Sequence, residues 1–360
     1  MLACETSPLL VAVPARHEDV RHLLKQKKRY AVLFWLAQGA VAGMLATFPV
    51  GGYWVASIIF SSLHIIIYYA FIFYFLRDLK KVSEEFPLAG MFLKAGLLFL
   101  VISTFGPWAV GIISAKGMGG SDLYYQAIYF YLHFQYNGFF TFILLALFLA
   151  LVQRHHPQLP AKTIKWGFWL LFVAAFPAYV LSLLGFAIPR LAVHVATVSG
   201  IVQWAGICLL LAVFHTMRKT FIQPREMWGN IYFAVALLSL FLKFSFQMAS
   251  GLRGIGEIAF AMTNTVVVGF LHLVMLGMVT CGIIALLDRQ GIITLKGPLA
   301  GPGNVLFLSG FVAMELLLFL QGLLIWLGSS GIPSYFEGLV ASGFMMVVGL
   351  VLVILQQVKK

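Results

Sequence analysis

The sequence predicts an all-α, polytopic transmembrane helix bundle, and three observations carry that prediction. The 360 residues are 61% hydrophobic and only 10% charged, with a mean hydropathy of +0.97. Ordinary soluble domains do not combine so much apolar with so little charged sequence. The apolar residues form long unbroken runs without the alternation of barrel strands, and in lipid such runs satisfy their backbone polar groups as helices.

Apolar windows of about 20 residues, the length that crosses a bilayer, predict about ten spans. They are expected at Tyr30–Phe48, Trp54–Leu76, Leu88–Ser114, Leu123–Gln153, Ile164–Gly185, Arg190–Met217, Trp228–Ser250, Glu257–Leu287, Asn304–Leu327 and Glu337–Val358. A basic segment, residues 1–29, precedes them, and residues 30–360 are expected to form a single transmembrane domain. No internal sequence repeat is obvious among the spans.

Positive charge predicts the orientation of the bundle, since Lys and Arg concentrate in cytoplasmic loops. With the first segment inside, 19 of the 24 Lys and Arg residues fall on the inner side. Only Lys116, Arg190 and Arg253 fall outside, and Lys94 and Lys243 lie within spans. Both termini are therefore expected in the cytoplasm of a bacterial cell, with the chain in its inner membrane. The net charge of +12 then reflects membrane orientation, and no nucleic-acid partner is expected.

Four histidines within the spans are the first candidates for chemistry, because ionisable side chains in a bilayer are costly. His64, His133 and His272 lie on the second, fourth and eighth spans, at a common depth of roughly 15–20 Å from the outer ends. His194, on the sixth span, lies nearer the outer surface. Neutral imidazoles that lie at the same depth on separate helices suit a haem or copper site. The alternative is that each imidazole forms a hydrogen bond to a neighbouring helix and only stabilises the packing of the bundle.

Further polar side chains accompany the histidines. Asn137 follows His133 by four residues and so shares its helix face, whereas Gln135 points elsewhere unless it reaches a neighbouring helix. Lys243, within the seventh span, needs a partner or a route to water, and it is a candidate for a proton relay. Glu315, deep in the ninth span, is a candidate proton relay; alternatively it pairs with Lys94 or another donor.

Three segments carry a resemblance to a known superfamily. The residues Tyr131-Leu-His133-Phe-Gln135-Tyr-Asn137-Gly138 resemble the helix of haem-copper oxidases and nitric oxide reductases that brings a histidine to copper B or non-haem iron. The residues Gly269-Phe-Leu-His272-Leu-Val-Met-Leu-Gly277 resemble the haem-ligating tenth helix, and His64 resembles the second-helix ligand of the low-spin haem. The NnrS family of membrane haem-copper proteins is similar in the same way.

The resemblance implies a set of ligands. His64 and His272 would be the axial ligands of one haem b, with His194 as a further haem-binding candidate. His133 and Asn137 would face a copper or iron site. Arg190 and Arg253, on the outer side, would lie near the haem propionates unless they are simply solvated loop charges.

The sequence also departs from the superfamily pattern at several points. Asn137 stands where the reductases have a glutamate. The span after His133 has no His-His pair, since His155 and His156 lie in an inner loop, and His272 is alone where the family helix has two histidines. The resemblance therefore implies one haem, or one haem with a reduced metal site, in place of a complete dinuclear centre.

The expected function is that of a membrane protein that binds haem or copper. It would bind, sense or reduce a small gas, nitric oxide or oxygen, or pass electrons from a donor protein or respiratory complex. Whether it is an oxidoreductase stays open. Two other classes stay open as well: a transporter whose polar midplane residues line a substrate path, and a structural subunit of a respiratory complex.

Overall fold

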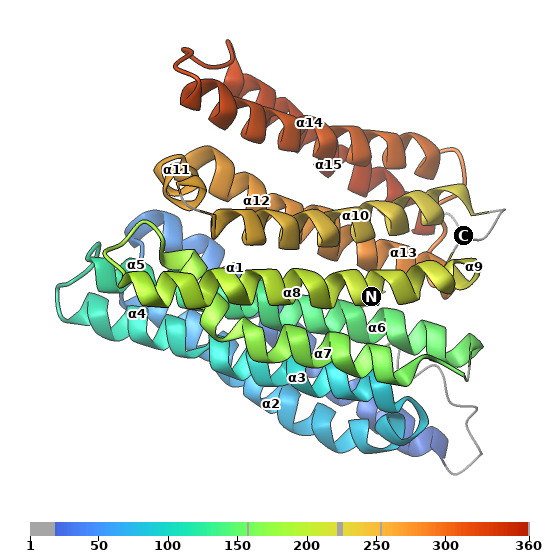
Figure 1. The fold of residues 1–360 in the computed structure, drawn as a ribbon. Coiled ribbons are helices and arrows are strands. Elements are labelled where there is room, and N and C mark those ends of the chain that lie inside the picture. Colours follow the sequence, from blue (N-terminus) through green and yellow to red (C-terminus); the bar gives the residue numbers. More distant parts are fainter. Residues whose placement is uncertain (1–18, 157, 222–225, 253, 359–360) are drawn as a thin grey trace. The chain divides into compact units, whose positions relative to one another are not determined.

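The described chain consists of helices and the short connections between them. The computed structural model describes residues 19–156, 158–221, 226–252 and 254–358, and no strand occurs in these ranges (Figure 1). Nine runs in this part of the chain are long and apolar enough to cross a membrane, and the pair Ala161–Ala175 and Pro177–Leu183, bent by 51°, makes a tenth. The predicted all-α class is confirmed, and the number of candidate spans agrees with the expected ten. The spans indicate a multi-pass membrane protein.

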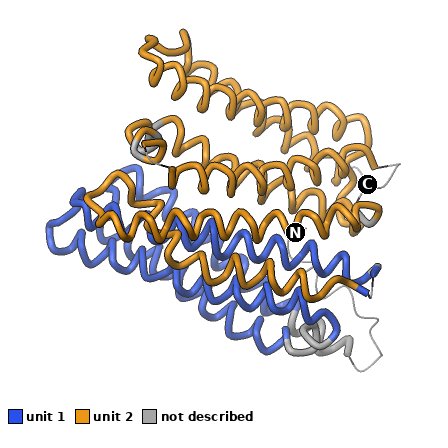
Figure 2. Tube along the Cα trace, in the orientation of Figure 1, with its two compact units in different colours: residues 1–158 blue, residues 159–360 orange. Residues whose placement is uncertain are grey.

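The helices form two compact units, residues 1–158 and 159–360 (Figure 2). In the first, the described elements are α1 (Asp19–Gly51), α2 (Val55–Glu85), α3 (Pro87–Ser103), α4 (Phe105–Ala115), α5 (Asp122–His133), a π-helical segment (Phe134–Phe140) and α6 (Thr141–His155). The expectation of a single domain over residues 30–360 stays a prediction.

The second unit has more elements. They are α7 (Ala161–Ala175), a 3-10 segment (Pro177–Leu183), α8 (Arg190–Thr216), α9 (Arg218–Phe221), α10 (Met227–Ser250), α11 (Ile255–Ala261), a π-helical segment (Thr263–Val267), α12 (Val268–His272), a further π-helical segment (Leu273–Thr280), α13 (Cys281–Arg289), α14 (Ala300–Trp326) and α15 (Tyr335–Val358). Pro177 begins the 3-10 segment at the bend, as expected where a proline removes a helical hydrogen bond.

Helix α3 forms the core of the first unit. It packs against α2, α6 and the segment Phe134–Phe140, and two of its phenylalanines, Phe92 and Phe99, are fully buried. Gly96 brings α6 close, because a Cβ there would lie 2.8 Å from Cδ1 of Ile143. This packing holds the helix of His133 against α3.

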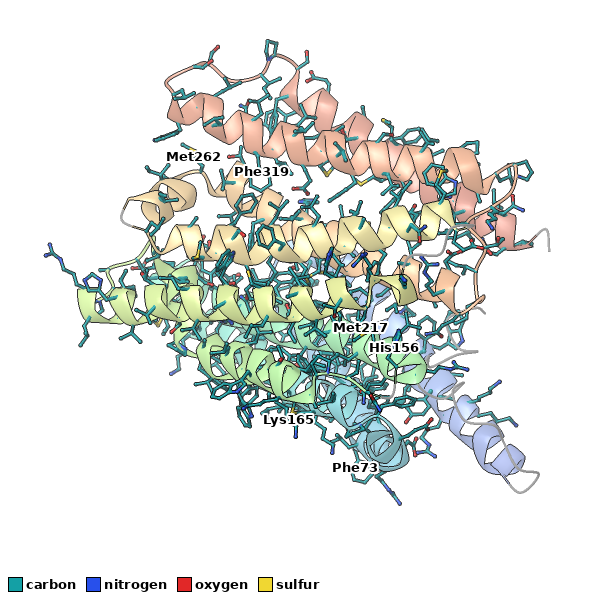
Figure 3. The ribbon with its side chains drawn as sticks, turned by 45° about the vertical axis from the view of Figure 1, so that its right-hand side comes forward. Phe73, His156, Lys165, Met217, Met262 and Phe319 are labelled. Atoms are coloured by element: carbon teal, nitrogen blue, oxygen red, sulfur yellow. The ribbon has the colours of Figure 1, made fainter. Side chains whose placement is uncertain are left out.

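Helix α10 has the same role in the second unit, where it packs against α8, α13 and Leu273–Thr280. The rings of Phe246 on α10 and Phe319 on α14 lie 5.2 Å apart between centroids, and Phe319 is labelled in Figure 3. Phe319 also covers Gly269, where a Cβ would lie 3.2 Å from Cε2 of that ring. Aromatic packing from α14 therefore closes over the turn that precedes His272.

Helices α14 and α15 run side by side (Figure 1) and approach each other through glycines. A Cβ on Gly303 would lie 2.8 Å from the carbonyl oxygen of Gly349, and a Cβ on Gly349 would lie 2.6 Å from that of Gly303. Small residues allow such close backbone contact in membrane helices.

Large apolar side chains remain exposed along the spans. Examples are Leu45 at 75%, Phe336 at 76% and Val340 at 73%. Apolar surface on this scale is expected to contact lipid, because water would not solvate it favourably. The structure thus supports the expected bilayer partner.

The two units repeat one arrangement that was not evident from the sequence. Seven of the eleven buried positions of α3 recur on α10 with a spacing of 140 residues: Ala89 and Gly229, Phe92 and Tyr232, Leu93 and Phe233, Gly96 and Ala236, Phe99 and Ser239, Leu100 and Leu240, Ser103 and Lys243. In the first unit α3 packs against the preceding span, α2, and against α6. In the second unit α10 packs in the same way against the preceding span, α8, and against α13. The two units therefore share this order of contacts between consecutive spans, and α14 and α15 follow it along the chain in the second unit.

Candidate functional site

The first histidine lies where α5 ends. His133 is 3% exposed, and the π-helical segment Phe134–Phe140 follows it before α6 begins at Thr141. The side-chain nitrogen Nδ2 of Asn137 lies 3.0 Å from Nδ1 of His133. The two side chains therefore meet on one face, as their spacing of four predicts.

Two residues account for the π-helical turn after His133. The hydroxyl of Thr141 donates a hydrogen bond of 2.6 Å to the carbonyl of Tyr136, five residues earlier. Gly138 lies directly on α3, because a Cβ there would be 2.4 Å from Cβ of Phe99. Only a residue without a side chain allows this approach. π-Helical turns inside α-helices are rare and are frequent at functional sites.

Gln135 ties the same turn to α3. It is 4% exposed, and its Nε2 donates a hydrogen bond of 3.0 Å to Oγ of Ser103. Ser103 in turn donates to the carbonyl of Leu100 at 2.7 Å. Gln135 thus reaches the neighbouring helix, which was the alternative left open by its position in the sequence. A satisfied buried hydrogen bond of this kind fixes the turn in place.

The second histidine of this group, His272, is half-buried and is the last residue of α12. Nδ1 of His272 lies 2.9 Å from the carbonyl oxygen of Val268. A carbonyl oxygen only accepts, so Nδ1 carries the proton and donates it. The other ring nitrogen, Nε2, therefore has a lone pair when the ring is neutral. This is the arrangement found in metal-ligating histidines, whose second nitrogen donates to a carbonyl or carboxylate.

The segment after His272 repeats the features seen after His133. Leu273–Thr280 is π-helical, and the hydroxyl of Thr280 donates to the carbonyl of Met275 at 2.8 Å, again five residues earlier. Gly277 lies on α10, since a Cβ there would be 2.3 Å from Oγ of Ser239. The sequence holds the signal for this likeness, because LHFQYNGFFT at 132–141 and LHLVMLGMVT at 271–280 share the pattern Leu-His-x4-Gly-x2-Thr.

The other two candidate histidines differ in their surroundings. His64, on α2, is half-buried, and its ring lies 4.3 Å from that of Tyr68 between centroids. His194 is exposed near the start of α8. His64 and His133 belong to the first unit, whereas His194 and His272 belong to the second. The pairing of His64 with His272 on one haem stays a prediction.

The predicted basic residues fall in three situations. Arg190 is exposed at the first residue of α8, and Arg253 lies outside the described residues. Lys243 is fully buried on α10, with Nζ 3.6 Å from the ring centroid of Phe244. The ring face supplies a favourable interaction for the ammonium group. The expectation that Arg190 and Arg253 lie near haem propionates stays a prediction.

Glu315 is half-buried on α14. Both of its carboxylate oxygens are buried and have no hydrogen-bond partner among the described residues. A carboxylate so placed in a span is costly and marks a functional candidate. Lys94, its suggested partner, is exposed on α3. The proton-relay role stays a prediction.

A glutamine pair on α8 and α10 was missed from the sequence. Nε2 of Gln247 donates to Oε1 of Gln203 at 2.6 Å, and Nε2 of Gln203 donates to the carbonyl of Leu171 at 3.4 Å. Gln203 is fully buried, and Oε1 of Gln247 is buried without a partner among the described residues. Two glutamines inside apolar spans were the available signal, since such residues join membrane helices.

Protein side chains alone do not form a multi-ligand metal site in the described part of the chain. No group of three or more His, Cys, Asp or Glu residues that would hold a metal ion occurs there. His156, labelled in Figure 3, follows α6 in the connection between units, and its backbone N–H donates to the carbonyl of Val152 at 2.8 Å. The loop position expected for His156 is confirmed, whereas His155 is still the last residue of α6.

Comparison with known proteins adds no family to this picture, since the chain matches neither a protein-family model nor a curated protein.

Proposed function

We propose that this chain is an integral membrane protein that binds haem b through intramembrane histidines, alone or with copper or iron beside it. In this role it binds, senses or reduces a small gas, nitric oxide or oxygen, or passes electrons. The observation that carries the proposal is the ring of His272, whose Nδ1 lies 2.9 Å from the carbonyl oxygen of Val268. That contact leaves Nε2 as the metal-binding atom of a neutral imidazole.

The number of protein side chains that are able to bind a metal favours haem over a metal ion held by the protein alone. A protein-bound transition metal usually takes three or four protein ligands, and no cluster of that size occurs among the described residues. Haem iron receives four nitrogens from its porphyrin and needs only one or two axial ligands from the protein. Single histidines on separate helices, such as His272 and His64, fit this requirement.

His133 and Asn137 are the candidates for binding a copper or iron ion or a small ligand. Their side chains lie 3.0 Å apart in a buried turn. An amide group offers both a donor and an acceptor, so Asn137 is able to support either tautomer of His133. The pair therefore suits a metal ion in one tautomer and a hydrogen bond to a small oxygen-containing ligand in the other.

The absorption spectrum of the protein tests this function directly. Protein expressed with sufficient haem and purified in detergent is expected to show a Soret band and the reducible α and β bands of b-type haem. Haem content per chain, measured as the pyridine haemochrome, should reach at least one. A folded, monodisperse preparation with neither haem nor bound copper or iron would refute the proposal.

A transporter is the second candidate, and the buried polar groups of the second unit favour it. Lys243 and Gln203 are fully buried, and Glu315 has no hydrogen-bond partner in the described chain. Polar residues inside spans line substrate paths in many transporters. A haem-free protein that carries out proton-coupled solute uptake in proteoliposomes, and loses it in Glu315→Gln, would support this function in place of the first.

The proposed orientation has both termini in the cytoplasm of a bacterial cell. It rests on the 19 of 24 basic residues on one side of the predicted spans. A fluorescent protein fused after Lys360 is expected to be bright, whereas alkaline phosphatase at that position should be inactive. The same phosphatase inserted at Gly119 should be active. The reverse pattern would show that the number or direction of spans is wrong.

A further inference from the structure

Helix α14 packs in antiparallel register against α12 and the π-helical segment before it. A Cβ on Gly322 would lie 3.0 Å from Oγ1 of Thr265, and a Cβ on Gly269 would lie 3.3 Å from Cβ of Leu318. The second contact also involves the ring of Phe319, which is labelled in Figure 3. From the first contact to the second, one segment advances by four residues while the other goes back by four. The register of the two segments is therefore fixed.

This register brings Glu315 to the level of His272. Glu315 lies three residues before the second contact on α14, and His272 lies three residues after it on α12. A further contact follows, since a Cβ on Gly277 would lie 2.7 Å from Cζ of Phe311. The contact residues of α14, at positions 311, 318 and 322, share one helix face with position 315. Glu315 and His272 are therefore opposite each other across this interface.

The chemistry of the two side chains is complementary. Both carboxylate oxygens of Glu315 are buried and have no hydrogen-bond partner among the described residues. A carboxylate that has lost its water and gained no hydrogen bond is costly, whereas a bound proton removes its charge and supplies a donor. His272 donates from Nδ1 to the carbonyl of Val268, so Nε2 of the neutral ring is an acceptor. The two groups are not hydrogen-bonded to each other here, and a change of rotamer at Glu315 would join them.

Helix α10 brings a third titratable group to the same level. Oγ of Ser239 would lie 2.3 Å from a Cβ on Gly277, and the rings of Phe246 and Phe319 lie 5.2 Å apart between centroids. Lys243, four residues after Ser239 and three before Phe246, shares their helix face and is fully buried. It therefore lies at the level of the carboxyl group, which is four residues before Phe319.

Few other titratable side chains belong to the helices around this level. The π-helical segments Thr263–Val267 and Leu273–Thr280 contain none. Helix α15, which packs on a different face of α14, carries Tyr335 and Glu337 in its first turn. The titratable groups that face Glu315 across these contacts are thus one imidazole and one amine.

We propose that Glu315, His272 and Lys243 form a proton-binding site between α10, α12 and α14. The carboxyl group of Glu315 holds the proton, and Nε2 of His272 accepts its hydrogen bond. Transfer of this proton breaks an O–H bond and forms an N–H bond, which leaves a carboxylate and an imidazolium without any exchange of electrons. Lys243 lies at the same level, so the titrations of the three groups are coupled.

The inference rests on the second candidate function, proton-coupled transport, and names the ligand of its polar site. Haem iron at Nε2 of His272 would use the same lone pair as the proton, so the site belongs to the haem-free chain. It requires no metal ion, in keeping with the absence of a group of three or more metal-ligating residues in the described part of the chain.

Infrared spectroscopy of the full-length chain tests the site. The protein is expressed in a haem-deficient host and purified in detergent, and the C=O absorption of protonated carboxyl groups is recorded while the pH is raised. We expect a wild-type band that shifts in D2O, decreases as the pH rises and is lost in Glu315→Gln. The matched control Glu337→Gln removes an exposed carboxyl group of α15 and should keep the band.

Variants at the two neighbours test whether the site is shared. In His272→Gln the band should move to another frequency, because the acceptor of the hydrogen bond has changed. His215→Gln, at an exposed position of α8, should leave the frequency unchanged. Lys243→Met should change the pH at which the band is lost. If His272→Gln does not fold, His272→Asn provides the same comparison.

The outcomes separate this inference from the proposed functions. A folded wild type without the band, or a band that persists in Glu315→Gln, would overturn the inference, and so would an unchanged frequency in both variants of His272. Proton-coupled uptake without the band would leave transport standing and refute the site. The band without uptake would leave the site standing and refute transport. Haem content of protein from haem-replete cells, measured as the pyridine haemochrome, tests the haem function independently of either result.

Discussion

Replacing His64 with alanine is expected to convert a six-coordinate, low-spin haem spectrum into a five-coordinate, high-spin one. In the proposed pairing the iron would then keep only His272, whose ring is oriented by the carbonyl of Val268. Loss of one strong-field imidazole weakens the ligand field while the other ligand retains the haem. The measurement is the position of the Soret band and the electron paramagnetic resonance of the oxidised protein.

The complementary variant and a control sharpen this test. His272→Ala should lose its low-spin haem altogether, because its ligand with a fixed tautomer is removed. Tyr68→Phe, which alters only the aromatic neighbour of His64 at 4.3 Å, should keep the low-spin spectrum. If both single histidine variants retain an unchanged low-spin spectrum, the pairing is wrong, and His133 with His194 becomes the pair to examine.

Gly138→Ala is expected to destabilise the protein by about 1–3 kcal/mol, the usual range for overpacking a close contact. The added Cβ would lie 2.4 Å from both Cβ and Cγ of Phe99. Cβ is bound to the backbone and has no rotamer that moves it away, so α3 and the π-helical turn must separate. His133 directly precedes that turn, so copper or iron bound at His133 should be lost as well. The measurements are thermal unfolding in detergent and metal content.

The matched control lies in the same unit. A Cβ on Gly111, in α4, would lie 3.9 Å from Cγ2 of Ile58, which is an ordinary contact. Gly111→Ala should be neutral or stabilising by up to about 1 kcal/mol, because alanine favours the helix. Equal stability of the two variants would show that the contact of Gly138 with α3 is looser than these distances indicate.

The spans were predictable because their signal is local. The span expected at Arg190–Met217 is observed as α8, Arg190–Thr216, and the span expected at Trp228–Ser250 is observed as α10, Met227–Ser250. Length and hydropathy decide such boundaries, since a helix must cross about 30 Å of hydrocarbon. The contact of His133 with Asn137 was predictable for a similar reason, because it lies within one helical turn.

The breaks inside the spans depend on contacts that hydropathy does not measure. The bend at Pro177 had a proline as its signal, but the π-helical turns depend on Thr141 and Thr280 and on glycines that meet a distant helix. The pairing of Gln203 with Gln247 likewise joins residues 44 positions apart. Side-chain packing between helices decides these features. The order of contacts that the two units share was not predicted from the sequence for the same reason, since few identical residues accompany it.

A π-helical turn has the register of an α-helix that has gained one residue. One residue corresponds to about 100° of rotation at 3.6 residues per turn. Phe142, Leu145 and Leu149 follow this extra residue and are fully buried on α6. The π-helical segment between α5 and α6 therefore changes the rotation of α6 relative to the face of α5 that carries His133. The π-helical segments that follow His133 and His272 thus separate the placement of each imidazole from the packing of the rest of its span.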